Sequence, residues 1–453
     1  VDMYNVAVGY DAGNAVTTGI QNTLIGGLAG DAITTASYNT AVGTSALSST
    51  TTGINNTAVG RTSLFVNTTG TQNVAIGMDA LQQNSTGSQN TAVGRSALIT
   101  NTTADNNTAL GYAALHANTT GAQNTAVGQA AGDALTVGSY NIALGQNALS
   151  SDTQGSQSVA IGSSALFTQN FTSATATNNT AVGHGAGAAV TTGTQNTFVG
   201  GLAGDGTNDG AECVAVGYLA LSANCGNSNT AVGSNALSQA TGATNTAIGY
   251  YTMGESVTSG NKNTSCGYAA GYAITGGSNN TFLGADAGRT ASPGGNTTTS
   301  SNKLALGDEN VTGAHVQVDW TVASDARDKT DFTALDLGLD FIKALAPVTY
   351  KWDKRSKYGD KKAEGYDLNA QTPDGTHKED WLDIGFKAQE VEALEIAAGY
   401  NKDNKTNLVS SHTDDGKQMG LQYSKFVPIL VKAIQEQQAL IEALTARITT
   451  LEG

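Results

Sequence analysis

A short pattern of polar and hydrophobic positions, Asn-Thr-Ala-Val-Gly, recurs along the first two thirds of the chain. Asn124–Gly128 is a complete copy, and most copies follow the last one after 17 residues. The motif glycines of the 18 repeats are Gly9, Gly26, Gly43, Gly60, Gly77, Gly94, Gly111, Gly128, Gly145, Gly162, Gly183, Gly200, Gly217, Gly233, Gly249, Gly267, Gly284 and Gly307. A fixed period of this size is typical of stacked repeats, each of which buries its apolar face only against its neighbours. The pattern therefore predicts an elongated repeat rod.

Each repeat combines a strand signal with turn signals. The Thr-Ala-Val triplet has the composition of a short strand, while Asn and Gly suit turns because both tolerate left-handed backbone conformations. A repeat at about 3.3 Å per residue spans roughly 56 Å, enough for one coil of two short strands and two turns. Coils stacked at about 4.8 Å would give a rod roughly 85 Å long. We therefore predict an all-β, parallel β-solenoid or β-roll over residues 1–307.

Both faces of the predicted strand are apolar. The residue before the motif glycine is bulky and mostly β-branched, as in Val42, Ile76 and Val127, so we expect that side to form the core of the coil. The residue two before the glycine is nearly always Ala, and a row of small side chains lets another surface approach closely. We therefore expect the Ala row to pack against a partner chain.

Large residues interrupt the Ala row at Leu24, Phe198 and Phe282. Each is flanked by glycines where most repeats carry Leu, namely Gly13 and Gly30, Gly187 and Gly204, and Gly271 and Gly288. Large side chains beside small ones are what a constant packing density demands. We predict that each large residue contacts its two glycines in one shared buried volume.

Two repeats are longer than the others. Four extra residues lie between Gly162 and Gly183, around Phe167 to Thr177, and six lie between Gly284 and Gly307, around Ser292 to Gly295. Insertions in a solenoid emerge as loops on one face, often the binding face. Tolerated loop variation is the alternative explanation for both.

Charge divides the chain into two parts. The formal net charge is -15, with 5 Lys plus Arg and 15 Asp plus Glu in residues 1–323, and 17 and 22 in residues 324–453. No basic stripe exists to neutralise phosphates, so nucleic-acid binding is not expected. The repeats offer no catalytic carboxylate pair and no calcium-binding aspartate spacing, and we expect no cofactor and no metal.

The cysteines Cys213, Cys225 and Cys266 lack metal-ligand spacing and are expected to be small filling residues. No apolar run approaches the ~18 residues that a membrane span needs, so no membrane insertion is expected. Because the chain begins at Val1 rather than Met, we expect a fragment or a processed chain.

The repeat motif resembles the head repeats of trimeric autotransporter adhesins, which also run Asn-x-x-Ala-Ile/Val-Gly. The likeness covers roughly residues 5 to 307, with a longer period here than in the family. It implies a left-handed parallel β-roll that assembles as a trimer.

The repeat pattern stops at Gly307, and residues 308–323 form a predicted junction. Val311 to Val322 has the composition of one or two strands, with Trp320 available as a packing plug. Ser324-Asp325-Ala326-Arg327-Asp328-Lys329 follows.

This hexapeptide resembles the start of the C-terminal intramolecular chaperone domain of endosialidase-type phage tail fibres and tailspikes. The same family has matching segments at Leu345, Pro347, Val348 and Tyr350, and at Gly385-Phe386-Lys387-Ala388-Gln389-Glu390-Val391. The resemblance implies an α+β chaperone domain over residues 324–453. It also implies self-cleavage between Ala323 and Ser324, with Ser324 as nucleophile and Lys329 as its base, so that any peptidase activity is a single turnover.

A heptad pattern closes the chain, in a helix predicted over about residues 424–452. Its seam residues are Val427, Leu430, Ile434, Gln437, Ile441, Leu444, Ile448 and Leu451. Such a seam predicts self-association, and alternating Val/Ile and Leu favours two strands in simple parallel coiled coils. The family resemblance and the Ala row favour three, and we predict a parallel homotrimer.

Two function classes follow. The first is a structural and receptor-binding tail fibre of a bacteriophage, assembled in the host cytoplasm and located in the virion, with other tail proteins and a host surface glycan as partners. The second is a bacterial surface adhesin of the trimeric autotransporter-like class. An enzyme acting on host glycans is a weaker third interpretation, because no catalytic domain is recognisable.

Overall fold

The computed structural model describes residues 3–254, 258–290, 292, 294–317, 322–360, 365–406 and 408–453. The chain divides into two compact units, which we call the rod unit and the C-terminal unit. The rod unit comprises Val1–Ala285 and Thr298–Leu304, and the C-terminal unit comprises Asp286–Thr297 and Ala305–Gly453.

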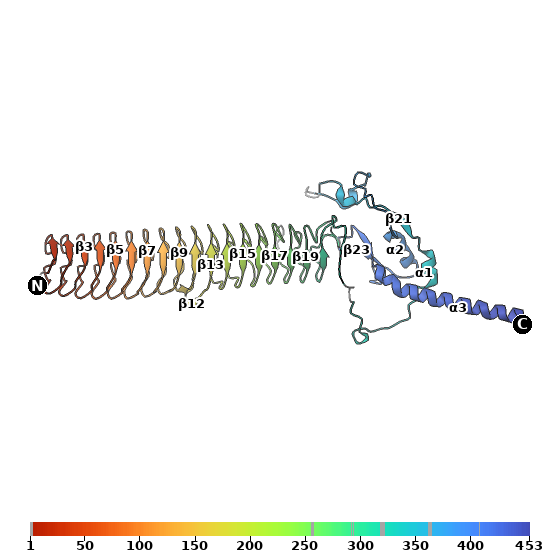
Figure 1. Cartoon of the computed structure of the whole chain (residues 1–453), viewed down its shortest axis with the longest axis horizontal. Helices are drawn as coiled ribbons and strands as arrows, with labels where there is room; N and C mark the ends of the chain where they lie inside the picture. Colours follow the sequence, from red (N-terminus) through yellow and green to blue (C-terminus); the bar gives the residue numbers. More distant parts are fainter. Residues whose placement is uncertain are drawn as a thin grey trace. The chain divides into compact units, whose positions relative to one another are not determined.

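The rod unit is a parallel β-solenoid, as predicted, and Figure 1 shows its coils in a single row. One strand from each coil contributes to an 18-stranded sheet. The strands of this sheet are β1 (Val6–Val8), β2 (Thr23–Ile25), β3 (Thr40–Val42), β4 (Thr57–Val59), β5 (Val74–Ile76), β6 (Thr91–Val93), β7 (Thr108–Leu110), β8 (Thr125–Val127), β9 (Ile142–Leu144), β11 (Val159–Ile161), β13 (Thr180–Val182), β14 (Thr197–Val199), β15 (Val214–Val216), β16 (Thr230–Val232), β17 (Thr246–Ile248), β18 (Thr264–Cys266), β19 (Thr281–Leu283) and β20 (Leu304–Leu306).

Neighbouring coils stack in register, so that each motif position forms a column along the rod unit. In a representative pair, Ala41 of β3 stands beside Ala58 of β4, and Val42 beside Val59. The motif glycine is required by this stacking: Gly43 has φ +137°, and a Cβ there would lie 2.5 Å from the carbonyl oxygen of Gly60 in the next coil. A side chain would therefore push adjacent coils apart.

The interior of the coil lies on the opposite side of the strand from the one predicted. The Ala column is fully buried, as at Ala41, Ala58 and Ala75, whereas the residue before the glycine faces outward and is 40% exposed at Ile76 and 47% at Leu110. Our assignment of the bulky row to the core and the Ala row to a partner chain was therefore wrong. The cause is a leucine four residues after the motif glycine.

Leucines at this fourth position fill the coil and leave room only for a methyl group on the inner face of the strand. Leu47, Leu64 and Leu81 are examples, and all three are completely buried. Their backbone is left-handed, with φ between 50° and 55°, a conformation unusual for leucine that turns each side chain inward. Dense packing on all sides holds these residues in a conformation that their local preferences disfavour.

The predicted exchange of volume between large residues and glycines is confirmed at five of the six glycines. A Cβ at Gly13 or Gly30 would lie 2.6 or 2.8 Å from a methyl group of Leu24. At Gly187, Gly204 and Gly271, the corresponding distances to ring carbons of Phe198 or Phe282 are 2.9, 2.6 and 2.8 Å. The contact of Phe282 with Gly288, which belongs to the C-terminal unit, stays a prediction.

Buried asparagines form a ladder through the rod unit. Asn39 Oδ1 accepts hydrogen bonds from the backbone N–H and the side-chain amide of Asn56, at 3.0 and 3.2 Å, and Asn39 Nδ2 donates to the Gly53 carbonyl at 3.0 Å. The first motif residue of most coils takes part in this way, so turn carbonyls and strand amides are satisfied inside the coil. A second, shorter ladder joins Asn67, Asn84, Asn101 and Asn118.

The C-terminal unit is an α+β structure. Its helices are α1 (Leu339–Ala344), α2 (Ala388–Ala397) and α3 (Phe426–Glu452), with one-turn 3-10 helices at Ala326–Asp328, Arg355–Lys357, Leu368–Ala370 and Tyr423–Lys425. Two antiparallel two-stranded sheets pair β21 (Val348–Tyr350) with β22 (Asp383–Gly385), and β23 (Ser410–His412) with β24 (Met419–Leu421). The core consists of Leu337, Phe341, Val391, Val409, Phe426 and Ile429.

The predicted closing helix is α3, whereas the predicted strands at the junction are not observed in the described residues 311–317 and 322. Trp320, the expected packing plug, lies outside the described residues. Within the described part of the chain, no helix is long and apolar enough to cross a membrane.

Candidate functional site

The predicted cleavage site lies in an exposed turn at the start of the chaperone-like segment. Lys329 Nζ is 2.6 Å from Ser324 Oγ, so the two predicted catalytic groups are in hydrogen-bond contact. Ala323, which carries the carbonyl of the predicted scissile bond, is described and exposed. The structure thus brings together the three residues that the sequence singled out.

A one-turn helix between the two groups explains their proximity. Asp325 caps this helix: its carboxylate accepts from the Arg327 N–H at 2.9 Å. The same carboxylate pairs with the Arg327 guanidinium at 2.6 Å. Hydrogen bonds from the Arg327 side chain, and then from its backbone, lower the pKa of Asp325. Asp325 and Arg327 therefore pair with each other and stabilise the turn. The Lys329 amine makes its hydrogen bond to Ser324.

Asp328 is the neighbour of Lys329 in the chain. In the described part of the chain its carboxylate makes no ion pair with Lys329, whose amine is directed to Ser324 instead. The arrangement has the elements of a serine nucleophile with an amine base.

The apolar residues of α3 lie in two different settings, and only one of them contains the predicted seam. Phe426, Ile429 and Ala433 are buried at the start of the helix, where Phe426 and Ile429 join the core of the C-terminal unit. Among the predicted seam residues, Ile434 is 63% exposed, and the others are exposed as well: Val427, Leu430, Gln437, Ile441, Leu444, Ile448 and Leu451. The two settings occupy different sides of the helix, so the seam is available to another chain.

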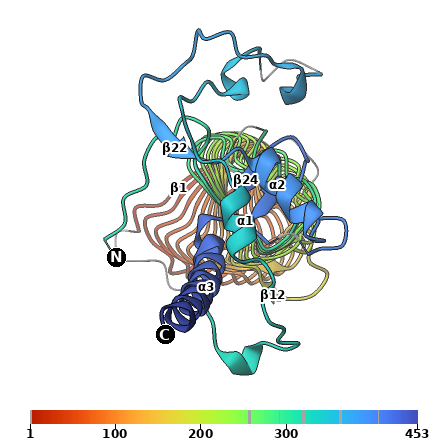
Figure 2. The ribbon, with the colours of Figure 1, turned by 90° about the vertical axis from the view of Figure 1, so that its right-hand side faces the viewer.

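The insertion around Phe167 to Thr177 is anchored inside its coil. Phe171 is buried, and its N–H donates to the carboxylate of buried Asp152 at 3.1 Å, while Gln169 Nε2 donates to the same group at 2.6 Å. The exposed residues 172–174 lead into β12 (Thr175–Ala176), which pairs with β10 (Gly155–Ser156). Figure 2 shows this loop beside β12 standing out from the outline of the coils.

The second insertion is part of the C-terminal unit rather than a free loop. Asn296 N–H donates to Asp415 in the turn between β23 and β24, at 3.2 Å. A Cβ at Gly295 would lie 2.7 Å from Thr413 Cβ, so a glycine is needed for this approach. The contact gives the insertion a structural role within its unit.

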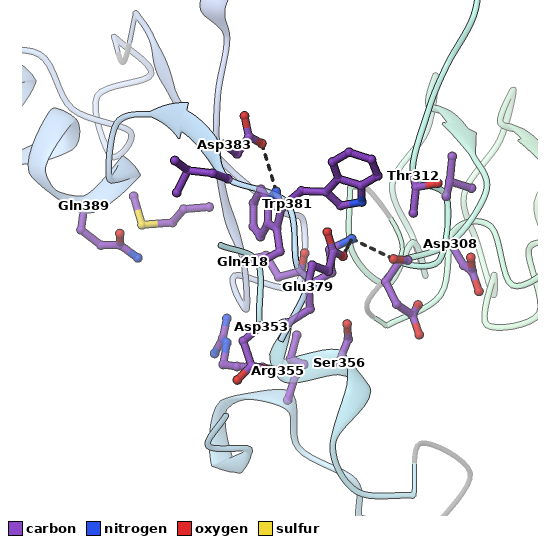
Figure 3. A pocket seen from close by; sticks show the side chains of 17 residues that line it. Asp308, Thr312, Asp353, Arg355, Ser356, Glu379, Trp381, Asp383, Gln389 and Gln418 are labelled. Carbon is purple, nitrogen blue, oxygen red and sulfur yellow. Dashed lines mark hydrogen bonds and ion pairs between the residues drawn. The ribbon is translucent and has the colours of Figure 1, made fainter. Parts of the chain in front are cut away.

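A hollow of about 790 Å³ in the C-terminal unit was not predicted (Figure 3). Trp352 Nε1 donates to Asp383 at 3.3 Å, and Lys354 Nζ lies 5.6 Å from the Trp352 ring centre and 3.5 Å from Glu379. Trp381 also lines the hollow and is 79% exposed. The walls come from segments between Asp308 and Met419, so no local motif could have revealed them.

Metal binding has no candidate site in the described ranges, which contain no group of three or more His, Cys, Asp or Glu side chains placed to hold an ion.

Comparison with known proteins gives a family match within the C-terminal unit. Residues 324–400 match the family described as "Chaperone of endosialidase". No curated protein matches the chain. The protein thus combines a β-solenoid rod with a chaperone segment of the endosialidase type, a combination that fits a protein of the tail-fibre or tailspike type.

Proposed function

We propose that the protein is a trimeric tail fibre of a bacteriophage, whose rod carries receptor-binding surface to the host and whose C-terminal unit aligns the three chains during assembly. The observation that carries the proposal is the family match at residues 324–400, directly after a β-solenoid. Receptor binding falls to the rod, where the loop at residues 172–174 is exposed.

Each unit of the chain supplies an apolar surface for the trimer. On the rod unit it is the outward column of residues that precede the motif glycines, which includes Ile25, Ile76, Leu110, Ile161 and Ile248. On the C-terminal unit it is the exposed seam of α3. Extended apolar stripes of this kind are typical of interaction surfaces.

The mass of the full chain in solution, measured by light scattering coupled to size exclusion, tests the assembly. We expect three chains per particle, and a monomer or dimer would overturn the proposal. Binding of the purified trimer to whole bacterial cells and to extracted surface glycans tests the receptor role. Binding that survives removal of the surface glycans would exclude a glycan receptor.

Residues 324–453, the part of the C-terminal unit that follows the cut, are further proposed to release themselves. Lys329 Nζ takes the proton of Ser324 Oγ, the oxygen attacks the Ala323 carbonyl carbon, and the C–N bond between Ala323 and Ser324 breaks as a C–O ester bond forms and the leaving nitrogen takes up the proton. Water then hydrolyses the ester, leaving a carboxylate on Ala323 and the free amine and hydroxyl of Ser324. The contact of 2.6 Å between Lys329 and Ser324 supports this step.

Release would serve assembly kinetics. The strands of a solenoid pair with strands of other coils, which are separated from them in sequence, so a solenoid folds slowly and can slip in register. A trimerising C-terminal unit would therefore align the chains first. Its removal then leaves the rod trapped against unfolding.

Denaturing electrophoresis of wild type beside Ser324→Ala decides the cleavage step. We expect two fragments from wild type and one full-length band from Ser324→Ala and Lys329→Gln. Asp328→Ala is the matched control within the same turn and should still be cut. A single full-length band in every variant would show that the C-terminal unit works without cutting.

A further inference from the structure

Two thiols meet inside one coil of the rod unit. Cys213 directly precedes β15 and Cys225 lies later in the same coil, and both side chains are buried. Their sulfur atoms are 3.8 Å apart. Cys266, the third cysteine of the chain, stands in the outward column and is exposed.

In four other coils of the rod unit, two buried asparagine side chains at these interior positions share one backbone acceptor. Asn73 Nδ2 and Asn84 Nδ2 both donate to the Gly87 carbonyl, at 2.8 Å. In the cysteine coil the corresponding carbonyl is Gly226, three residues before the next ladder asparagine, and Cys213 Sγ lies 3.4 Å from it. Thiols are weak hydrogen-bond donors. The two replacements together therefore weaken the ladder at one level.

The ladder is intact on both sides of this level. Asn196 Oδ1 still accepts from the Cys213 N–H at 2.9 Å, and Asn229 Oδ1 accepts from the Asn245 N–H at 2.9 Å. Filling alone would explain each cysteine separately, but it does not explain why two cysteines contact each other within one coil. A covalent bond between them would restore at this level the crosslink that the amides provide elsewhere.

We propose that Cys213 and Cys225 are a redox pair that closes to a disulfide within the coil. An S–S bond of about 2.05 Å requires the sulfur atoms to approach each other by roughly 1.8 Å. The oxidant is a small hydroperoxide such as hydrogen peroxide. The Cys225 thiolate attacks a peroxide oxygen, which gives a sulfenic acid and hydroxide; Cys213 then attacks the sulfenic sulfur, the S–S bond forms and water leaves.

The polar surroundings assign the two roles. The Cys213 thiol donates to Cys225, and this hydrogen bond, helped by one from Thr207 and opposed by burial, lowers the pKa of Cys225 to about 7. The same contact and burial raise the pKa of Cys213. Because the thiolate is the reactive form, Cys225 attacks the peroxide and Cys213 resolves the sulfenic acid.

The disulfide would join the start of β15 to the far side of the same coil. A crosslink restricts the unfolded chain and stabilises the folded one. It would also bind the coil at the level where the asparagine ladder is interrupted, so local opening of β15 should slow once the bond forms.

The experiment uses the full chain with Cys266→Ser, which removes the exposed thiol. The protein is treated with dilute hydrogen peroxide while folded, quenched, denatured, alkylated and digested for mass spectrometry. We expect a linked peptide pair containing Cys213 and Cys225 and the loss of both alkylated cysteines. Two freely alkylated cysteines after peroxide treatment would overturn the proposal, as would links only between different chains.

Single variants test the order of the two steps. Cys213→Ser should still fold, because Ser158 already occupies the same ladder position in another coil. In this variant we expect dimedone to trap a sulfenic acid on Cys225. In Cys225→Ser, Cys213 should stay alkylatable; a sulfenic acid on Cys213 at the rate of the wild-type reaction would contradict the assigned roles. Circular dichroism identical to wild type confirms that each variant is folded.

Discussion

Leu135 occupies the interior space that a side chain at Gly132 would need: a Cβ on Gly132 would lie 3.1 Å from Leu135 Cδ1. The same relationship joins Gly30 to Ile33, at 2.8 Å. Most coils with leucine at the fourth position instead carry a polar residue three places later, as in the pair Leu115 and Asn118. Coils without a large residue on the strand therefore fill most of their interior from one of these two positions.

Exchanging the two arrangements tests this relationship. Leu135→Ala should cost about 2–5 kcal/mol because it leaves a cavity, and Gly132→Leu alone should cost about 1–3 kcal/mol through overpacking. The double variant Gly132→Leu with Leu135→Asn copies Leu115 and Asn118, and places an amide near Asn118 Oδ1, a buried oxygen that has no hydrogen-bond donor among the described residues. We expect its unfolding temperature to recover most of the loss. Additive losses in the double variant would refute the exchange.

The asparagine ladder should contribute strongly to rod stability. Asn90 Oδ1 accepts from the Asn107 N–H at 2.9 Å, and Asn90 Nδ2 donates to the Ala104 carbonyl at 2.8 Å. Asn90→Ala leaves the Asn107 N–H without its acceptor, whereas the Ala104 carbonyl keeps Asn101 Nδ2 at 3.1 Å, and we expect a cost of about 1–3 kcal/mol. Hydrogen exchange of the amides in β6 and β7 should accelerate. Gln129→Ala, at an exposed position, is the control and should change stability by less than about 0.5 kcal/mol.

The outward apolar column should be needed for assembly. Leu110→Asp places a charge in the column and should reduce the population of trimers measured by light scattering, with the coil fold retained by circular dichroism. Gln129→Asp introduces the same charge at an exposed position of the next coil and should leave the trimer intact. Equal trimer populations in both variants would move the interface to another face of the rod.

Glu395 should make the C-terminal unit sensitive to acid. Its carboxylate accepts from the backbone N–H groups of Leu408, Val409 and Ser410, at 2.8, 2.5 and 3.0 Å. Burial raises its pKa, but the hydrogen bonds from Ser410 and the backbone together outweigh burial and leave the pKa below the usual 4.5. A lowered pKa stabilises the fold above the unfolded value of 4.5, and this contribution disappears as the pH falls through the folded pKa.

Glu395→Gln should therefore lower the free energy of unfolding at pH 7 by about 3 kcal/mol and flatten its dependence on pH below 4.5. Glu390→Gln, on the same helix, breaks only the exposed pair with Lys387 and should cost less than about 1 kcal/mol. A wild-type stability that is constant between pH 5 and pH 3 would contradict this role of Glu395.

The sequence by itself determined the solenoid, because a period of 17 residues with a glycine at one place leaves only in-register stacking as a way to bury every repeat. The resemblance to the chaperone family, carried by Ser324 to Lys329, also implied the pairing of Ser324 with Lys329, and the one-turn helix between them brings the two side chains into contact. The packing of Phe198 against Gly187 and Gly204 could be predicted from the sequence, because a large side chain appears where the neighbouring repeats carry glycine in place of leucine.

Only the tertiary structure decided which face of each strand is inside. The Thr-Ala-Val triplet is apolar on both faces, and the choice depends on leucines such as Leu47, whose left-handed backbone no propensity rule anticipates. The contact of Cys213 with Cys225 and the hollow beside Trp352 and Trp381 were hidden for a related reason. Their partners are separated in sequence and meet only when the coil or the C-terminal unit closes, so local pattern carries no trace of them.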